Sequence, residues 1–138
     1  MVRTERWEIQ TRGGGEMHDL TPRVEAAIAA SGCQEGIVTV FVAHTTAAVA
    51  ISEYEPGLID DFPAMLERLV PPDQGYRHNA INHDDNAHSH LRASLLGPSL
   101  TVPFDRGRLA LGIWQRIVLI DFDTHPRSRQ VVVQVLGE

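Results

Sequence analysis

The chain has 138 residues, of which 43% are hydrophobic and 22% charged, a composition that suits a single globular domain spanning residues 1–138. Its formal net charge of -6 disfavours broad binding to nucleic acid or to an anionic membrane, because both attract basic surfaces. The lone cysteine, Cys33, cannot form an internal disulfide, so we expect a cytoplasmic protein without a membrane span or signal peptide.

The sequence of the N-terminal half predicts a strand, then a helix, and then further strand structure. Residues 2–11 alternate imperfectly, as in an edge strand, and the glycines at 13–15 form a turn. Residues 21–31 read as a helix, with Pro22 in its first turn and Gly32 as its end. A further strand is expected at residues 37–42, and residues 45–52 form either another strand or the same strand continued past a bend.

The middle of the chain is predicted to be helical and irregular. Apolar residues recur at helical spacing up to residue 70, and we place the start of that helix near Asp60 so that Pro63 lies in its first turn. Residues 71–85 are polar and irregular, as functional loops often are. A short helix then begins close to His90 and turns Leu91 and Leu95 inward.

The C-terminal part is rich in valine, isoleucine and leucine and predicts strands at residues 99–104, 108–122 and 129–138. Strands dominate both ends and helices the middle, without regular βαβ alternation. We therefore predict an α+β fold with mostly antiparallel, sandwich-like sheets and two to three helices.

Four of the seven histidines fall between residues 78 and 90, and neutral imidazole is both a common metal ligand and a proton carrier near pH 7. A catalytic zinc site needs three protein ligands, which His44, His78, His88 and His90 could supply. If His88 and His90 were both helical, they would point about 200° apart and could not share an ion. If Ser89 instead caps the helix, both can face one way. The alternative is a solvated polar loop.

Other polar residues interrupt apolar segments. His44 ends a buried strand and lines a pocket or is a satisfied core histidine; Glu53 is a candidate base or an exposed carboxylate. Trp114 and Gln115 interrupt an apolar strand, and a buried glutamine needs hydrogen-bond partners. The chain has twelve arginines and no lysine, so arginine forks such as Arg129 are the side chains suited to phosphate.

Six pieces resemble the YjbQ-like family, also called the secondary thiamine-phosphate synthase family, and the resemblance runs in order from about residue 21 to residue 138. They are "HTTAA", "SEYEPG", "VPPDQGYRH", "NAHSHLRASLLGPSLTVP", "GRLALGIWQRI" and "VLGE". The resemblance implies an α+β fold with a β-sandwich-like core, a homotrimer, and a histidine-lined, metal-binding cleft near subunit contacts.

The resemblance and the residue pattern together give the candidate site residues. Catalytic roles fall to His44, Glu53, His90 and Gln115, substrate contacts to Tyr76, Trp114 and Arg129, and metal binding to His44, His78, His88 and His90; Glu53 and Trp114 rest on the residue pattern alone. His88 belongs to a variant of the family motif. The chain departs from the family pattern at Ser52, Ile113 and Asp121, which stand where asparagine, threonine and glutamate are usual.

Two functions follow. One is a thiamine-phosphate synthase, which joins a pyrimidine pyrophosphate to a thiazole phosphate and releases pyrophosphate, helped by a divalent metal ion, zinc first. The other is a non-catalytic trimer that binds a metal or a small phosphorylated metabolite through the same residues. The chain has no aspartate-rich pyrophosphate motif beyond "HDD" at residues 83–85, which weakens the first.

Overall fold

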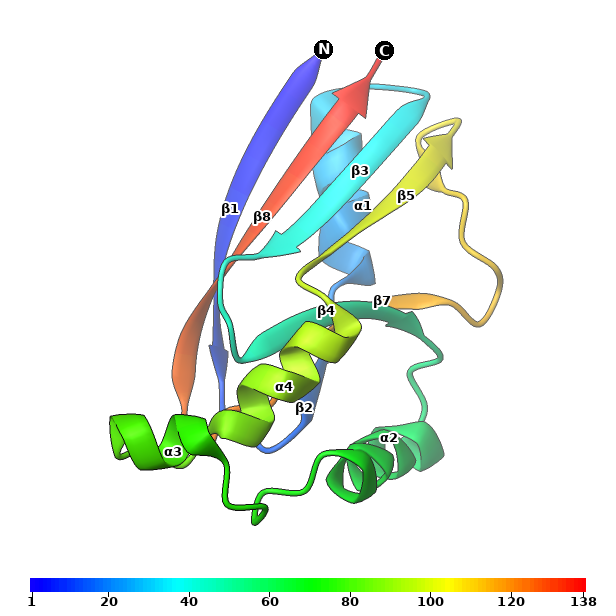
Figure 1. Ribbon diagram of the computed structural model, residues 1–138. Helices are drawn as coiled ribbons and strands as arrows, with labels where there is room; N and C mark the ends of the chain where they lie inside the picture. The colour runs from blue at the N-terminus through cyan, green and yellow to red at the C-terminus, as the bar shows by residue number, and fades with distance from the viewer.

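Strands with alternating inward and outward side chains form a five-stranded antiparallel sheet in the computed structural model, which describes residues 1–138 (Figure 1). Its order is β1 (Val2–Thr11), β8 (Arg127–Gly137), β3 (Gly36–Val42), β5 (Ser99–Asp105) and β6 (Arg108–Leu109). In β8, the central run Val131, Val133 and Val135 is fully buried while Gln134 is exposed. The imperfect alternation predicted for residues 2–11 is confirmed, and β1 is an edge strand as expected.

A three-stranded antiparallel sheet packs on the inner face of the first. Its order is β2 (Glu16–Asp19), β7 (Arg116–Asp121) and β4 (Ala47–Ser52). The middle strand β7 buries Ile117, Val118, Leu119 and Ile120 completely. Both of its faces are covered, which explains an unbroken apolar run where a half-exposed strand would alternate.

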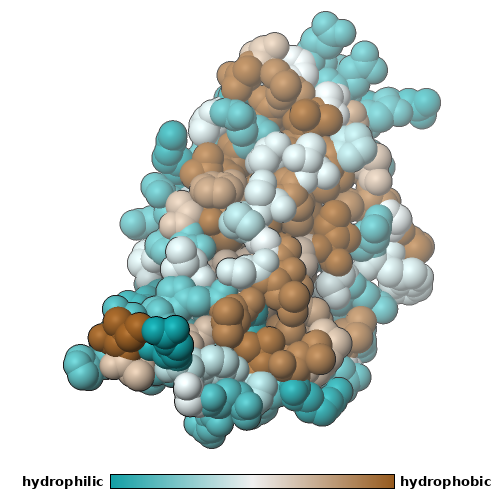
Figure 2. Space-filling model, in the orientation of Figure 1, coloured by the Kyte–Doolittle hydropathy of each residue, from teal (hydrophilic) through white to brown (hydrophobic).

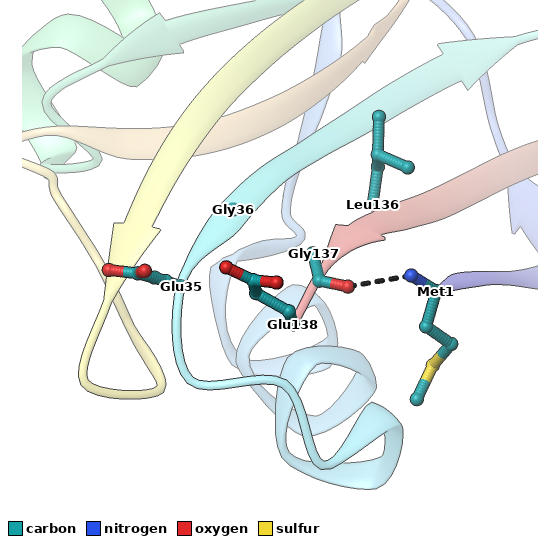
Figure 3. Close-up of a pocket in the computed structure, with 6 residues that line it drawn as sticks. All are labelled: Met1, Glu35, Gly36, Leu136, Gly137 and Glu138. Carbon is teal, nitrogen blue, oxygen red and sulfur yellow. Dashed lines mark hydrogen bonds between the residues drawn. The ribbon is translucent and has the colours of Figure 1, made fainter.

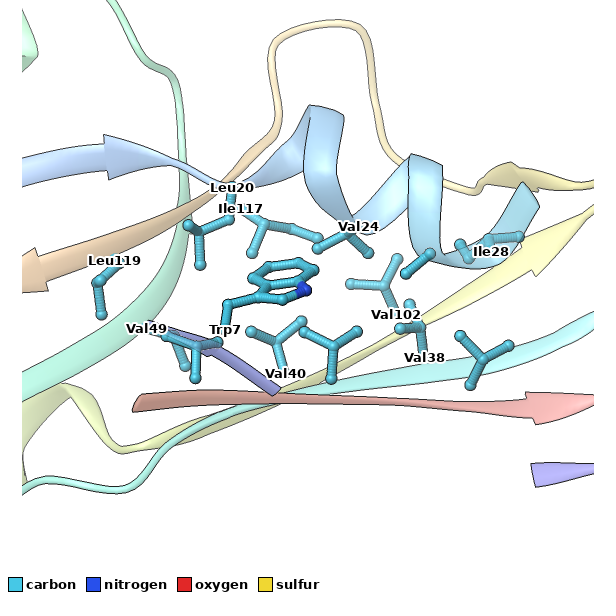
Figure 4. Packing of buried hydrophobic residues seen from close by; sticks show 14 of the residues in the cluster. Trp7, Leu20, Val24, Ile28, Val38, Val40, Val49, Val102, Ile117 and Leu119 are labelled. Carbon is cyan, nitrogen blue, oxygen red and sulfur yellow. The ribbon is translucent and has the colours of Figure 1, made fainter. Parts of the chain in front are cut away.

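Two hydrophobic cores lie on the two faces of the smaller sheet. The larger core fills the space between the sheets and α1 (Thr21–Ser31), and Trp7 lies among Val24, Val40 and Ile117 at its centre (Figure 4). The smaller core packs Leu66 and Ala93, from the helices α2 (Pro56–Leu69) and α4 (Ala87–Leu96), against the other face. The predicted α+β, sandwich-like antiparallel fold is therefore confirmed.

The helix after β4 starts earlier than predicted. It begins at Pro56, because the Glu55 side chain accepts hydrogen bonds from the backbone N–H groups of Gly57 and Leu58 (3.0 and 2.5 Å). Pro63 consequently lies inside the helix rather than in its first turn, and its ring faces Gly15. The expected start near Asp60 was wrong, because the Glu55 cap places the first turn of the helix at Pro56.

Two further predictions in the middle of the chain were wrong. The stretch expected to be irregular contains a short helix, α3 (Arg77–Asn82). The following helix α4 begins at Ala87, three residues before His90, and its Leu91 and Leu95 are exposed. Ala87, Ser89 and Ala93 face the core instead, because small side chains let the helix lie close to β4.

Apolar side chains also reach the surface over α4. Figure 2 shows hydrophobic residues gathered along this helix and at the lower end of the molecule, and Leu91 and Leu95 are the exposed leucines of α4. The outer face of the larger sheet carries Ile37, Phe41 and Leu136, all more than a third exposed. No helix of the protein is both long and apolar enough to cross a membrane.

Candidate functional site

The space between the sheets changes from apolar to polar at one end. The inward row of β8 runs from Val135 through Val133 and Val131 to Arg129, and the inward row of β1 ends at Thr11. The facing strand β7 ends in Asp121, which is completely buried. Charged groups in such a place must be paired, because transferring an isolated charge from water into a protein interior is very costly.

Arg129 is the centre of this polar end. Its Nε and Nη2 donate to the two carboxylate oxygens of Asp121 (2.5 and 2.9 Å), and Nη2 also donates to the hydroxyl of Thr46 (2.7 Å). Asp121 further accepts from the hydroxyl of Thr11. Despite burial, the Arg129 and Thr11 hydrogen bonds hold the pKa of Asp121 below its ordinary value.

A second buried carboxylate, Asp123, lies beside the first. It accepts hydrogen bonds from the backbone of Thr124 (2.8 Å), the hydroxyl of Thr46 (2.9 Å) and Nε of Arg127 (3.0 Å). These bonds outweigh burial and lower the pKa of Asp123 to about 2. Both carboxylates are therefore ionised at neutral pH, and each faces an arginine.

The glycine turn between β1 and β2 fixes these carboxylates in place. Gly14 and Gly15 donate their N–H groups to the carbonyls of Asp123 and Asp121 (2.9 and 2.7 Å). Gly13 has a φ of +86°, and a Cβ there would lie 2.2 Å from the carbonyl oxygen of Asp123. Only glycine lets the two backbones approach this closely.

His44 lies where β3 leaves the larger sheet. Ala43 still donates its N–H to the carbonyl of Gln130 (3.1 Å), but the N–H of Gln130 donates to Nε2 of His44 (2.9 Å) instead of to another carbonyl. The ring is half-buried. Burial and the neighbouring positive charge of Arg129 lower the pKa of His44, so it is largely neutral at pH 7.

His90 and His78 form a pair beside His44. Their ring centroids are 4.6 Å apart at an angle of 57°, and Nε2 of His78 is 3.1 Å from Oδ1 of Asn86. Burial lowers the pKa of His90, and the charge that His78 would carry lowers it further. Two half-buried imidazoles from α3 and α4 thus meet at the polar end of the sandwich.

Two adjoining hollows connect these groups. One, of about 400 Å³, is lined without any hydrophobic residue, and its walls are His44, Thr45, Thr46, Asn86, His90, Asp123, Arg127, Ser128 and Arg129. The other, of about 280 Å³, is bounded by His44 and His90 and extends toward Ala93 and Pro98. His44, His90 and Arg129, all predicted from the sequence, are therefore brought together.

His88 and Tyr76 lie outside these hollows. Because α4 starts at Ala87, both His88 and His90 are helical, and the rings point to different sides as the helical alternative required. His88 is buried, and its Nδ1 has no hydrogen-bond partner within the chain. The hydroxyl of Tyr76 donates to the carbonyl of Pro71 (2.6 Å) and closes the loop before α3.

The remaining predicted site residues lie at the opposite end of the β4–β7 pair; they are Glu53, Trp114 and Gln115. In the register of these strands Ala47 faces Asp121 near the histidines, whereas Ser52 faces Arg116 at the far end. Glu53 follows Ser52, and Gln115 precedes Arg116.

The prediction that Gln115 is buried near the histidines was wrong. Gln115 is exposed and lies in a turn, where its Oε1 accepts from the N–H of Gly112 (2.8 Å). The turn interrupts the strand expected over residues 108–122 and displays Ile113 and Trp114, which are 86% and 68% exposed. The amide that seemed to need a buried ligand instead closes a turn at the surface.

The four predicted metal ligands do not form a complete site within one chain. No group of three or more histidine, cysteine, aspartate or glutamate side chains is arranged to hold a metal ion. His78 and His90 are neighbours, but the Nε2 lone pair of His44 is occupied by a backbone N–H and His88 lies elsewhere. Zinc in a catalytic site takes three protein ligands.

The largest hollow, of about 530 Å³, lies at the far end of the sheet where the termini meet (Figure 3). Its walls include Glu35 and Glu138, and the Met1 ammonium donates to the carbonyl of Gly137 (2.8 Å). It contains none of the histidines or arginines discussed above. Size alone therefore does not make it the better candidate.

Charged residues at the ends of buried strands in the sequence indicate the polar end. Asp121 and Asp123 flank Phe122 directly after a buried apolar strand, and Arg129 occupies an inward position in a row of valines. A charge at the end of a buried row indicates a pairing partner on the facing sheet. Thr46 and Asn86, which have no charge, gave no such signal.

The family described as UPF0047 protein YjbQ-like matches residues 5–138. A UPF0047 protein from Archaeoglobus fulgidus is 45% identical over 128 residues, covering 93% of this chain and 97% of that protein. Another, from Methanothermobacter thermautotrophicus, is 44% identical over 137 residues and covers 99% and 94% of the two chains. The chain belongs to the YjbQ-like UPF0047 family.

Solved structures agree with this assignment. The crystal structure of a YbjQ-like protein of unknown function from Sulfolobus solfataricus P2 has a TM-score of 0.90 and 36% identity, with full coverage of both chains. A hypothetical protein from Aeropyrum pernix K1 has a TM-score of 0.91 and 38% identity, with 99% coverage of each chain. The two sheets and their helices are thus an arrangement that these relatives share.

Proposed function

We propose that the hollow at the polar end of the sandwich binds a small phosphorylated metabolite. The observation that carries the proposal is its lining, which is wholly polar and combines two histidines with two arginines. Guanidinium groups and imidazole N–H groups are suited to phosphate oxygens. Arg127 is nearly half exposed and retains donor atoms beyond the Nε that contacts Asp123.

Charge balance limits the kind of anion that fits. Arg127 faces Asp123 and Arg129 faces Asp121, so the two cations are largely neutralised by the two carboxylates. Binding therefore depends on directed hydrogen bonds more than on net positive charge. A monophosphate fits this arrangement better than a pyrophosphate, which concentrates more negative charge.

The enzymatic form of the proposal is a transfer reaction of the thiamine-phosphate synthase type. In that reaction the guanidinium groups would stabilise the departing pyrophosphate, and His90 would accept or donate a proton. The developing pyrimidine cation needs an aromatic or apolar wall. Tyr76 and Trp114, the expected candidates, line neither hollow, so the binding function has the stronger support.

A divalent ion, zinc first, is proposed only with help from outside the chain. His78 and His90 can approach one ion, and a bound phosphate or a neighbouring subunit would have to supply the remaining ligands. A metal held there would neutralise charge on a phosphate. The proposed binding by His44, Arg127 and Arg129 does not depend on it.

A homotrimer in the cytoplasm is also proposed. The support is the apolar surface that one chain leaves uncovered, namely the exposed Trp114 and Ile113, the leucines of α4, and the outer face of the larger sheet. The single cysteine agrees with a reducing compartment. Sedimentation showing a stable monomer at micromolar concentration would contradict the trimer.

Calorimetric titration tests the binding proposal with thiazole phosphate, a pyrimidine pyrophosphate and inorganic phosphate as the three probes. We expect phosphate-dependent binding that is lost in Arg127→Gln and retained in Arg108→Gln, an exposed arginine that does not line the hollow. Binding of none of the three probes would refute the proposal. Release of pyrophosphate when both organic probes are present would establish the enzymatic form.

A further inference from the structure

We propose that His44 is held by the backbone of Gln130 as the tautomer with its proton on Nδ1, and that this N–H binds an oxyanion oxygen of the ligand. The proposal rests on the phosphate-binding function proposed above and assigns His44 a definite role within it. It also removes His44 from the set of metal ligands that the resemblance implied.

One ring nitrogen of His44, Nε2, faces the main chain. The N–H of Gln130 lies 2.9 Å from Nε2 of His44. A backbone amide carries its hydrogen under all ordinary conditions and can only donate, so Nε2 must present a lone pair. Turning the ring over would place a carbon against this N–H and lose the bond. The donor therefore determines the orientation of the ring.

The other ring nitrogen of His44 is Nδ1. Neutral imidazole has one N–H, and if Nε2 is the acceptor, the proton is on Nδ1. Nδ1 has no hydrogen-bond partner within the chain and is not among the buried atoms that lack one. It is consequently accessible to a ligand, and both hollows at the polar end have His44 in their walls.

The end of the pairing between β3 and β8 explains why the main chain holds the ring in this way. Ala43 directly follows β3, and its N–H makes the last backbone hydrogen bond to β8 at this end. The ring of His44 takes the place of the carbonyl that would have accepted the N–H of Gln130. Losing this bond would leave the N–H of Gln130, on an inner strand of the sheet, without an acceptor, which disfavours both the other tautomer and the doubly protonated ring.

His44 and His90 therefore have different chemical roles. His44 can give a hydrogen bond to a phosphate or carboxylate oxygen but cannot give a lone pair to a metal or accept a proton from a substrate. Arg129 directly precedes Gln130 on β8 and lines the same hollow as His44, so the two residues bind one anion from adjacent positions. Proton acceptance is left to His90.

The test uses the full-length protein labelled with ¹⁵N-histidine. Two-bond ¹H–¹⁵N correlations at about pH 8 distinguish protonated from unprotonated ring nitrogens, and the His44 signals are assigned by their loss in His44→Gln. We expect a protonated Nδ1 and an unprotonated Nε2 for His44. A protonated Nε2, or an averaged mixture of tautomers, would overturn the inference.

Inorganic phosphate and Zn²⁺ are then added separately. Phosphate should shift the Nδ1–H resonance of His44, whereas Zn²⁺ alone should leave its tautomer unchanged. If phosphate binds without affecting His44, the inference fails while the proposed function survives. If phosphate does not bind although Nδ1 is protonated, the proposed function fails, and with it the assigned ligand. Coordination of Zn²⁺ by His44 would also overturn the inference.

Two substitutions separate the two nitrogens by their effects on binding. His44→Asn places an amide N–H near the position of Nδ1, whereas His44→Gln keeps an acceptor for Gln130 near the position of Nε2. We expect His44→Gln to weaken phosphate binding about tenfold, the value of a hydrogen bond to a charged group, and His44→Asn to weaken it less. His18→Gln, on β2 and outside both hollows, is the control. The opposite order, with Asn the weaker binder, would count against the donor role.

Discussion

Arg129 on β8 and Asp121 on β7 form a bidentate ion pair that joins the two sheets at the polar end of their shared core. The two side chains are 3% and 0% exposed. Both side chains are almost entirely removed from water, so each depends on the other for its charge to be tolerated. The pair thus connects the packing of the sandwich with the composition of the candidate site.

Removing one partner of this pair should destabilise the fold strongly. Arg129→Leu leaves Asp121 buried and unpaired, and we expect a loss of about 3–5 kcal/mol in the free energy of unfolding. Urea denaturation monitored by circular dichroism measures it. Arg108→Leu removes an exposed arginine without a partner and should change stability by less than about 0.5 kcal/mol. Equal effects of the two substitutions would show that the buried pair is not important.

Asp123 predicts a loss of stability in strong acid. Its pKa is lowered to about 2 in the folded protein, from an ordinary value of 3.8. The ionised form is therefore favoured by folding, so its contribution is present above pH 3.8 and disappears as the pH falls through 2. The difference corresponds to roughly 2 kcal/mol. Asp123→Asn should lower stability at pH 7 and reduce the dependence on pH between about 4 and 2, measured by thermal unfolding.

The histidines predict a second transition at higher pH. Burial lowers the pKa of His44, His88 and His90 below the ordinary 6.5. Below pH 6.5 the unfolded chain binds more protons than the folded one, so stability is greatest above that value and declines on acidification. His88→Gln should reduce this decline between pH 7 and 5, whereas His83→Gln, at an exposed position, should not. A flat profile in the unchanged protein would contradict the prediction.

Zinc binding should follow the observed pairing of histidines. We expect His78→Ala and His90→Ala each to abolish zinc uptake that depends on added phosphate, because only these two rings are adjacent. His88→Ala should retain it, since His88 lies on another side of α4. Metal content after dialysis, measured by atomic emission, compares the variants. Loss of zinc in His88→Ala with the fold intact would restore His88 as a ligand.

The sequence predicts the sheets better than the site because the two depend on different information. Alternating valines in β8 and the apolar run of β7 are local patterns, and burial follows from them directly. The position of Gln115 depends on a turn at residues 112–115 that the surrounding apolar residues conceal. The strand expected over residues 108–122 is interrupted between Leu109 and Arg116, which places Gln115 at the surface instead of in the core.

The histidines illustrate the same limit at α4. His90 was placed correctly in the cleft beside His44, because both flank buried segments. His88 was placed wrongly, because the start of the helix decided its direction and was misjudged by three residues. Asn79 fixes that start through tertiary structure, since its side chain accepts the N–H of Ala87 (3.0 Å). A contact eight residues away along the chain is not visible in local spacing.

The turn that Gln115 closes displays Ile113 and Trp114 at the surface. We expect this turn to favour contact with another subunit. The turn is closed twice, by the N–H of Gln115 donating to the carbonyl of Gly112 (3.0 Å) and by the side-chain bond in the opposite direction (2.8 Å). Such closure reduces the conformational entropy that would be lost on association. We expect Trp114→Ala to weaken the proposed trimer at least about tenfold and Gln115→Ala to weaken it less, because truncating a tryptophan at the centre of an interface typically costs about 2 kcal/mol or more.

Analytical ultracentrifugation over a range of protein concentrations measures this effect. Leu136→Ala, which truncates an exposed residue at the far end of the larger sheet, tests whether any loss of apolar surface would do the same. If Trp114→Ala remains as associated as the unchanged protein while Leu136→Ala dissociates, the outer face of the larger sheet is the interface instead. Tryptophan fluorescence gives an independent reading, because Trp114 should move to shorter emission wavelength on association while the buried Trp7 does not change.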